Sequence, residues 1–237
     1  MRERTMGLPW LIAAAALMVV LWRVPYGGYI LYPFSALATW FHEMGHGLTA
    51  MLLGGRFETL RLYSNLSGLA YHTGSVFGGP FGRAMVSAGG PLGAPVAGFL
   101  LILSSRRIST ARAGLALLGF LLILSAVLWV RTLFGICFTV LMGAAIFGAL
   151  RWLPADLQGF LVQFFGVQAC LSTYRQLDYL FTKDITIAGT PMLSDSARIG
   201  EILLGPYWFW GGTLAVAAFA LLAAGLRLAY RPSPRPQ

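Results

Sequence analysis

An HExxH motif at residues 42–46 contains the side chains best suited to chemistry in this sequence. On a helix, His42 and His46 lie four positions apart and share one face, so both imidazoles can reach one metal ion. Glu43 lies one position round the helix, where its carboxylate can take a proton from a metal-activated water. We therefore predict that His42 and His46 bind zinc and that Glu43 is the general base.

The surroundings of the motif strengthen this interpretation, because the segment that contains it is otherwise apolar. An unpaired ionisable group at bilayer depth is costly, so a glutamate with two histidines there indicates a functional site. The alternative is a pair of hydrogen-bonded core histidines beside a neutral glutamate.

The composition is typical of a membrane-embedded chain. Of the 237 residues, 57% are hydrophobic and 11% are charged, and the mean hydropathy is +0.73. The net charge of +9 does not indicate nucleic-acid binding, because the arginines lie at the ends of apolar runs, where they meet lipid headgroups. Cys137 and Cys170 each lie inside an apolar run and are interpreted as small buried hydrophobes.

About seven hydrophobic segments predict an all-α, polytopic membrane bundle that forms a single domain over residues 1–237. A basic, disordered tail is predicted at residues 227–237, and the first segment is predicted to be a retained membrane helix rather than a cleaved signal peptide. The predicted spans cover residues 7–23, 30–53, 85–103, 113–130, 132–150, 157–181 and 207–226.

Two further stretches, one between spans and one within the third span, have a different character. Residues 56–72 alternate in polarity around a polar turn and predict a small interfacial β-hairpin. The segment could be no more than an interfacial loop, or it could offer a sheet edge that pairs with an unwound substrate strand. His72 on this hairpin is a weaker candidate metal ligand. Small residues at 88–94, at the start of the third span, predict a close approach of helix backbones.

A hydrolytic zinc site takes three protein ligands, so a third must come from outside the motif. Among the eight acidic residues, the choice narrows to Asp178 and Asp195. We predict Asp178, because its segment is apolar enough to lie at the depth of the histidines, although it could instead pair with Arg175. Asp195 remains the rival ligand, although it could simply cap a short helix that ends near Gly200.

These features resemble the site-2 protease family of intramembrane zinc metallopeptidases, in its short multi-pass branch without an inserted domain. The match at residues 42–46 is letter for letter. Gly90-Pro91 resembles the Gly-Pro-x-x-Asn motif of the family, with Ala94 in place of Asn. Leu177-Asp178 resembles the Leu-Asp-Gly motif that provides the third ligand, with Tyr179 in place of Gly, and residues 194–196 resemble a Ser-Asp-Ala stretch of short relatives.

The resemblance implies an integral membrane protein, placed in the bacterial cytoplasmic membrane, that hydrolyses peptide bonds in or near transmembrane segments. It implies one zinc per chain as cofactor, and a membrane-protein substrate and the lipid bilayer as partners. The alternative is a catalytically silent scaffold that keeps the fold and binds partner proteins. Glu43 argues against this alternative, because a protein that only binds has no need of a general base beside two metal ligands.

Overall fold

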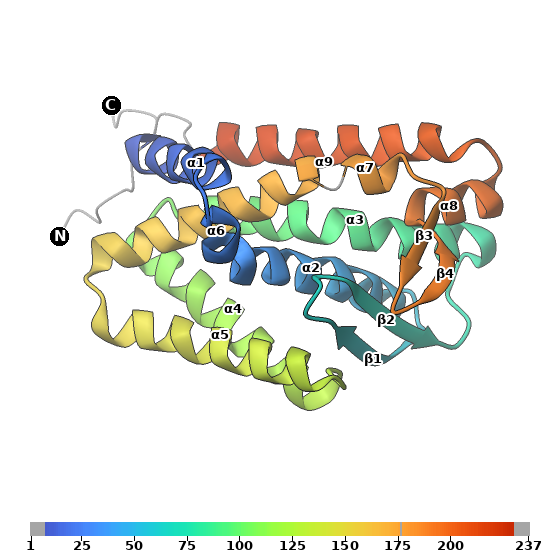
Figure 1. Cartoon of the computed structure of the whole chain (residues 1–237), viewed down its shortest axis with the longest axis horizontal. Coiled ribbons are helices and arrows are strands. Elements are labelled where there is room, and N and C mark those ends of the chain that lie inside the picture. Colours follow the sequence, from blue (N-terminus) through green and yellow to red (C-terminus); the bar gives the residue numbers. More distant parts are fainter. Residues whose placement is uncertain (1–7, 176, 230–237) are drawn as a thin grey trace, which may run out of the picture.

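The computed structural model describes residues 8–175 and 177–229, and within them the chain forms nine helices and two hairpins (Figure 1). The helices are α1 (Leu8–Arg23), α2 (Gly27–Leu52), α3 (Gly79–Ser104), α4 (Ile108–Leu128), α5 (Leu133–Trp152), α6 (Ala155–Arg175), α7 (Leu177–Leu180), α8 (Asp195–Leu203) and α9 (Tyr207–Ala229). The strands are β1 (Arg56–Leu62), β2 (Gly68–Thr73), β3 (Asp184–Ile187) and β4 (Thr190–Leu193).

Each predicted hydrophobic segment corresponds to at least one of these helices. Four helices, α3, α4, α5 and α9, are long and apolar enough to cross a membrane, and α1 contains a shorter apolar stretch at Ile12–Leu21. Polar side chains distinguish α2 and α6 from the four: α2 contains the HExxH motif, and α6 contains buried glutamines. The structure thus supports a mostly helical membrane protein, and the predicted number of seven spans is not confirmed.

Helices α2 and α3 form the central pair, and Figure 1 shows α3 lying between α2 and α9. Their backbones approach so closely that a Cβ atom on Gly45 would lie 2.1 Å from the carbonyl oxygen of Gly89. A Cβ atom on Gly93 would lie 2.3 Å from the carbonyl oxygen of Phe41. Only glycine fits at these crossings, which confirms the close approach predicted from the small residues at 88–94.

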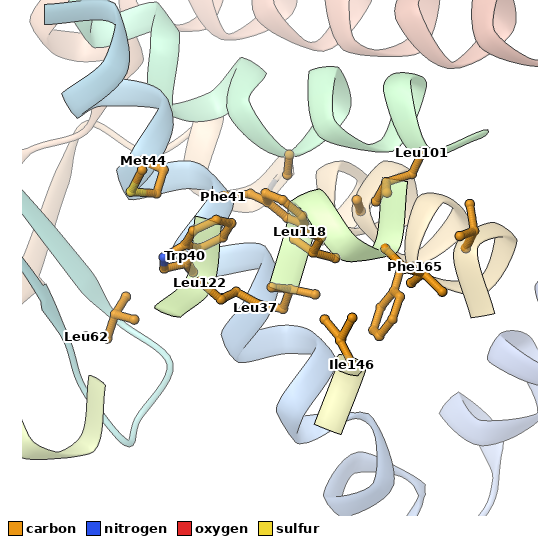
Figure 2. Packing of buried hydrophobic residues seen from close by; sticks show 14 of the residues in the cluster. Leu37, Trp40, Phe41, Met44, Leu62, Leu101, Leu118, Leu122, Ile146 and Phe165 are labelled. Carbon is orange, nitrogen blue, oxygen red and sulfur yellow. The ribbon is translucent and has the colours of Figure 1, made fainter. Parts of the chain in front are cut away.

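Helix α2 also packs into the largest hydrophobic cluster, which joins α2 to β1, α3, α4, α5 and α6 (Figure 2). Leu37, Phe41 and Met44 follow the helical spacing of one buried face. Trp40 is also buried there, and its indole N–H donates to the Ser125 hydroxyl of α4 at 2.9 Å. This packing fixes the rotation of α2 and directs the histidine face away from α4 and α5.

The hairpin predicted at residues 56–72 is confirmed, since β1 and β2 pair in antiparallel fashion. The other edge of β1 is covered by the α4–α5 connection, because Leu60 forms a parallel bridge with Val130. Leu60 donates to the carbonyl of Trp129 at 2.8 Å and accepts from the N–H of Arg131 at 3.0 Å. Among the described residues, no strand pairs with the outer edge of β2.

A second antiparallel hairpin, β3–β4, lies between the last two predicted spans, where the sequence analysis predicted no strand. Its turn lies at Ala188 and Gly189, which both have positive φ. The strands are only four residues long, too short to give a clear alternation in the sequence. Figure 1 shows both hairpins at the same end of the molecule as α7 and α8.

Two predictions at the C-terminal end have different outcomes. The short helix expected at residues 194–200 is confirmed as α8, but its cap is Ser194 rather than Asp195 and it continues to Leu203. The Ser194 side chain accepts from the N–H of Ala197 at 3.3 Å. The disordered tail predicted from residue 227 begins too early, because α9 continues to Ala229. The rest of that tail, residues 230–237, lies outside the described part of the chain.

Candidate metal centre

Helix α2 presents both histidines of the motif on one face, as the spacing predicted. The Nε2 atoms of His42 and His46 lie 3.2 Å apart, and the rings meet edge to face with centroids 4.9 Å apart. Both side chains are largely buried, with exposed fractions of 11% and 14%. Two imidazole nitrogens that converge in this way can bind one metal ion.

Helix α3 sets the orientation and the protonation of His46. The Nδ1 atom of His46 lies 2.8 Å from the carbonyl oxygen of Val86. Because a carbonyl can only accept, Nδ1 carries the proton and the lone pair of Nε2 is free to bind a metal. Gly90 provides the space for this ring, since a Cβ atom there would lie 2.1 Å from Nε2. Within the Gly-Pro motif, it is therefore the absence of a side chain at Gly90 that makes room for the imidazole of His46.

The third side chain that could bind a metal here comes from α8. The Oδ2 atom of Asp195 lies 3.1 Å from Nε2 of His42 and 3.3 Å from Nε2 of His46. Asp195 is the first residue of α8, directly after the Ser194 cap. The Ser196 hydroxyl donates to the carbonyl of Leu180 at 2.7 Å and thereby ties the start of α8 to α7.

Asp178, the favoured third ligand in the sequence analysis, does not join this group. It lies in α7 with an exposed side chain, and its backbone carbonyl accepts from the Thr182 hydroxyl at 2.6 Å. Successive residues of a helical turn point in different directions, and in α7 it is Tyr179 that faces the histidines. His72 also lies outside the group of three. Arg175, the alternative partner of Asp178, has no described side chain.

The donor set fits a zinc ion. The three ligand atoms of His42, His46 and Asp195 lie 3.1 to 3.3 Å from one another. Tetrahedral zinc with bonds of about 2.0–2.1 Å separates its ligand atoms by about 3.3 Å. Two imidazole nitrogens and one carboxylate oxygen are also ligand types found in catalytic zinc sites, which leave a fourth position for water.

Glu43 lies beside this centre and directly beneath strand β2. Its side chain is 6% exposed, and its carboxylate accepts a hydrogen bond from the backbone N–H of Ala70. A Cβ atom on Gly68 would lie 2.6 Å from Cγ of Glu43, so only glycine lets the strand lie so close. The predicted general base is thus held against the open edge of the first hairpin.

The site opens into a cavity of about 460 Å³ between the two hairpins. One wall is formed by Leu66–Gly68 and the other by Tyr179 and Ile185–Ile187, while His42 and Glu43 line the same space. This arrangement leaves room for an extended segment of another chain to lie across the centre.

A smaller space of about 70 Å³ adjoins this cavity and shares His42 and Glu43 with it. His72 and Arg198 are two further basic residues that line it. Desolvation by burial, with a smaller effect of the positive charge of Arg198, lowers the pKa of His72 below its ordinary value. His72 is therefore uncharged at neutral pH, and it lines the site without joining the ligand group.

Tyr179 is the functional candidate that sequence reasoning missed. Its hydroxyl donates to Oδ2 of Asp195 at 2.8 Å, and its ring meets that of His42 edge to face with centroids 5.8 Å apart. The available signal was its position in the altered Leu-Asp-Gly motif, where it was noted only as a departure from glycine.

Comparison with known proteins gives the family. The Peptidase M50B-like family matches residues 10–225, which is most of the chain. The chain therefore belongs to this family, which is the site-2 protease family, as the motifs predicted. No curated protein and no solved structure matches the chain.

Proposed function

We propose that this protein is an intramembrane zinc metalloprotease that hydrolyses peptide bonds in or near transmembrane segments of other membrane proteins. The observation that carries the proposal is the convergence of His42, His46 and Asp195 on one point beside Glu43. In this proposal Asp195 takes the role for which the sequence favoured Asp178. The bacterial cytoplasmic membrane is the proposed location, as the family resemblance implies.

The reaction is the addition of water to a peptide carbonyl. A bound zinc supplies a Lewis acid that polarises the carbonyl and lowers the pKa of water to about 7. Glu43 accepts one proton of the water while the water oxygen bonds to the carbonyl carbon. The same carboxylate then gives that proton to the amide nitrogen as the C–N bond breaks, so no external acid is needed.

The two hairpins define where the substrate lies. A peptide backbone in lipid is hydrogen-bonded within its own helix, so the substrate must unwind locally before it is cut. The open edge of β2 can then pair with the unwound strand and replace the hydrogen bonds that it has lost. The backbone of Ala70 in this strand donates a hydrogen bond to Glu43, and Gly68 lies close to the same side chain. A substrate strand that pairs with β2 therefore lies next to the general base.

A trapping experiment tests the proposal. Cells expressing wild type or Glu43→Gln are compared by quantitative mass spectrometry of their membrane proteins, and proteins that accumulate uncut in the variant are reconstituted with purified enzyme. We expect zinc-dependent cleavage by wild type, with loss of about 10²-fold or more in Glu43→Gln, which keeps its zinc. Equal cleavage of every reconstituted candidate by both proteins would overturn the proposal.

A further inference from the structure

The Tyr179 hydroxyl makes two hydrogen bonds with Asp195, and together they determine where the hydroxyl proton points. The backbone N–H of Asp195 donates to the hydroxyl oxygen at 3.2 Å. The hydroxyl lies 2.8 Å from Oδ2 of the same residue. Because an N–H group can only donate, the hydroxyl accepts from it, and its own proton points to Oδ2. This carboxylate oxygen is also the one that faces both histidines.

We propose that Tyr179 is a positioning residue that holds the Asp195 carboxylate in the orientation needed to bind zinc. This inference rests on the proposed zinc site, and it assigns the residue that replaces glycine in the Leu-Asp-Gly-like motif. Outer hydrogen bonds of this kind orient metal ligands, and their loss costs about 10- to 100-fold in metal affinity.

The need for such a group follows from the position of Asp195 in the fold. It lies at the first residue of α8, directly after a hairpin, whereas the two histidines project from the middle of a long helix. A carboxylate in this position can rotate about its side-chain bonds. The Tyr179 hydroxyl removes this freedom before the metal arrives, so less conformational entropy is lost on binding.

The backbone around Tyr179 is itself tied to α8. Besides the Ser196 hydrogen bond to Leu180, the Ser194 hydroxyl donates to the carbonyl of Thr182 at 2.5 Å. Ser194, Asp195 and Ser196 thus each contact the α7 turn or the residues that follow it. These contacts keep the hydroxyl and the carboxylate together, while the ring of Tyr179 packs against His42.

Zinc affinity separates the role of the hydroxyl from that of the ring. Wild type, Tyr179→Phe and Tyr179→Leu are purified in detergent, and zinc affinity is measured by competition with a chromophoric chelator. The cobalt-substituted proteins are compared by visible absorption, which reports ligand geometry without any substrate. Tyr32→Phe is the matched control, because Tyr32 also donates a hydroxyl hydrogen bond, to the carbonyl of Ser64 at 2.6 Å, outside the metal group.

We expect zinc affinity to fall about tenfold or more in both Tyr179→Phe and Tyr179→Leu, with an altered cobalt spectrum. Tyr32→Phe should bind zinc as wild type does. Wild-type zinc affinity and cobalt spectrum in Tyr179→Phe would overturn the inference, because this variant keeps the ring and lacks only the hydroxyl. Any loss of affinity in Tyr179→Leu would then come from ring packing alone.

A second pair of variants covers poor folding of Tyr179→Phe. Tyr179→Gln and Tyr179→Met have similar volumes, and only glutamine offers a hydrogen-bond donor. Tighter zinc binding by the glutamine variant supports the inference, and equal binding overturns it. Failure of the inference differs from failure of the proposed function: in the first case wild type still binds zinc and cleaves the trapped substrates, whereas in the second wild type shows no cleavage that depends on zinc and on Glu43.

Discussion

The candidate metal centre is built from two regions of very different kinds. The motif helix α2 presents His42, Glu43 and His46 from one regular segment, fixed in rotation by a large apolar cluster. The segment from α7 to α8 presents Asp195 through a helical turn, a short hairpin and a helix cap. In the first region the helical period places the ligands, and in the second region hydrogen bonds between backbone and side chains do so.

This difference separates the two ligands that the sequence predicts directly from the third, for which the sequence left a choice between Asp178 and Asp195. A spacing of four residues on a helix gives the same geometry in any fold, so His42 and His46 can be predicted from the motif alone. The position of Asp195 depends on how β3, β4 and α7 fold back toward α2, and no local pattern encodes this. The predictions below test the contrast, beginning with the largest expected effect.

Removing the third ligand should abolish the centre. Asp195→Ala leaves two imidazoles, and we expect stoichiometric zinc and measurable cleavage to be lost. Asp178→Ala should keep both within about twofold, because its carboxylate is exposed and outside the ligand group. Zinc content by mass spectrometry, with circular dichroism to check folding, makes the comparison. The opposite pattern in the two variants would restore Asp178 as the ligand.

Filling the space beside the His46 ring should have the second-largest effect on zinc binding. In Gly90→Ala the new methyl group would lie 2.1 Å from Nε2, so the ring must leave its position and zinc affinity should fall at least about tenfold. Gly212→Ala in α9 is the matched control, because nothing lies within 4 Å of its added Cβ atom. Titration with a zinc chelator compares the two, and equal affinities would show that α3 does not hold His46.

A methyl group on the first hairpin should affect catalysis rather than metal binding. In Gly68→Ala the Cβ atom would lie 2.6 Å from Cγ of Glu43, which displaces β2 or the carboxylate. We expect kcat on a trapped substrate to fall about tenfold at full zinc content, since displacement of the base weakens proton transfer. Gly28→Ala, with nothing within 4 Å, is the control. Zinc loss in Gly68→Ala would contradict this separation of roles.

The smallest expected effect concerns the cap of α8. Ser194→Ala and Thr132→Ala each remove a helix cap, at the start of α8 and α5 respectively, and each should lower stability by about 1 kcal/mol. Only Ser194→Ala should also weaken zinc binding, because Asp195 follows directly. Thermal unfolding with and without added zinc checks both effects. A larger loss of zinc affinity in Thr132→Ala would argue that general stability sets affinity.

Much of the fold was predictable because it depends on local patterns. Apolar runs gave the positions of the long helices, alternation gave the β1–β2 hairpin, and the Ser-Asp-Ser stretch at residues 194–196 indicated the start of α8. Glycines at 88–94 gave the close packing of α2 on α3. The β3–β4 hairpin was missed because its strands are short, and Tyr179 because its role depends on a tertiary contact to Asp195.

The most direct test of the account is the position of zinc itself. In crystals of the zinc-loaded protein, anomalous diffraction at the zinc absorption edge would locate the ion. Cryo-electron microscopy of the zinc-loaded protein would locate it as density at the centre. The account predicts one zinc bound by Nε2 of His42, Nε2 of His46 and a carboxylate oxygen of Asp195, with Tyr179 hydrogen-bonded to that carboxylate. Zinc bound by Asp178, or a zinc-saturated sample with no metal between the two histidines, would contradict it.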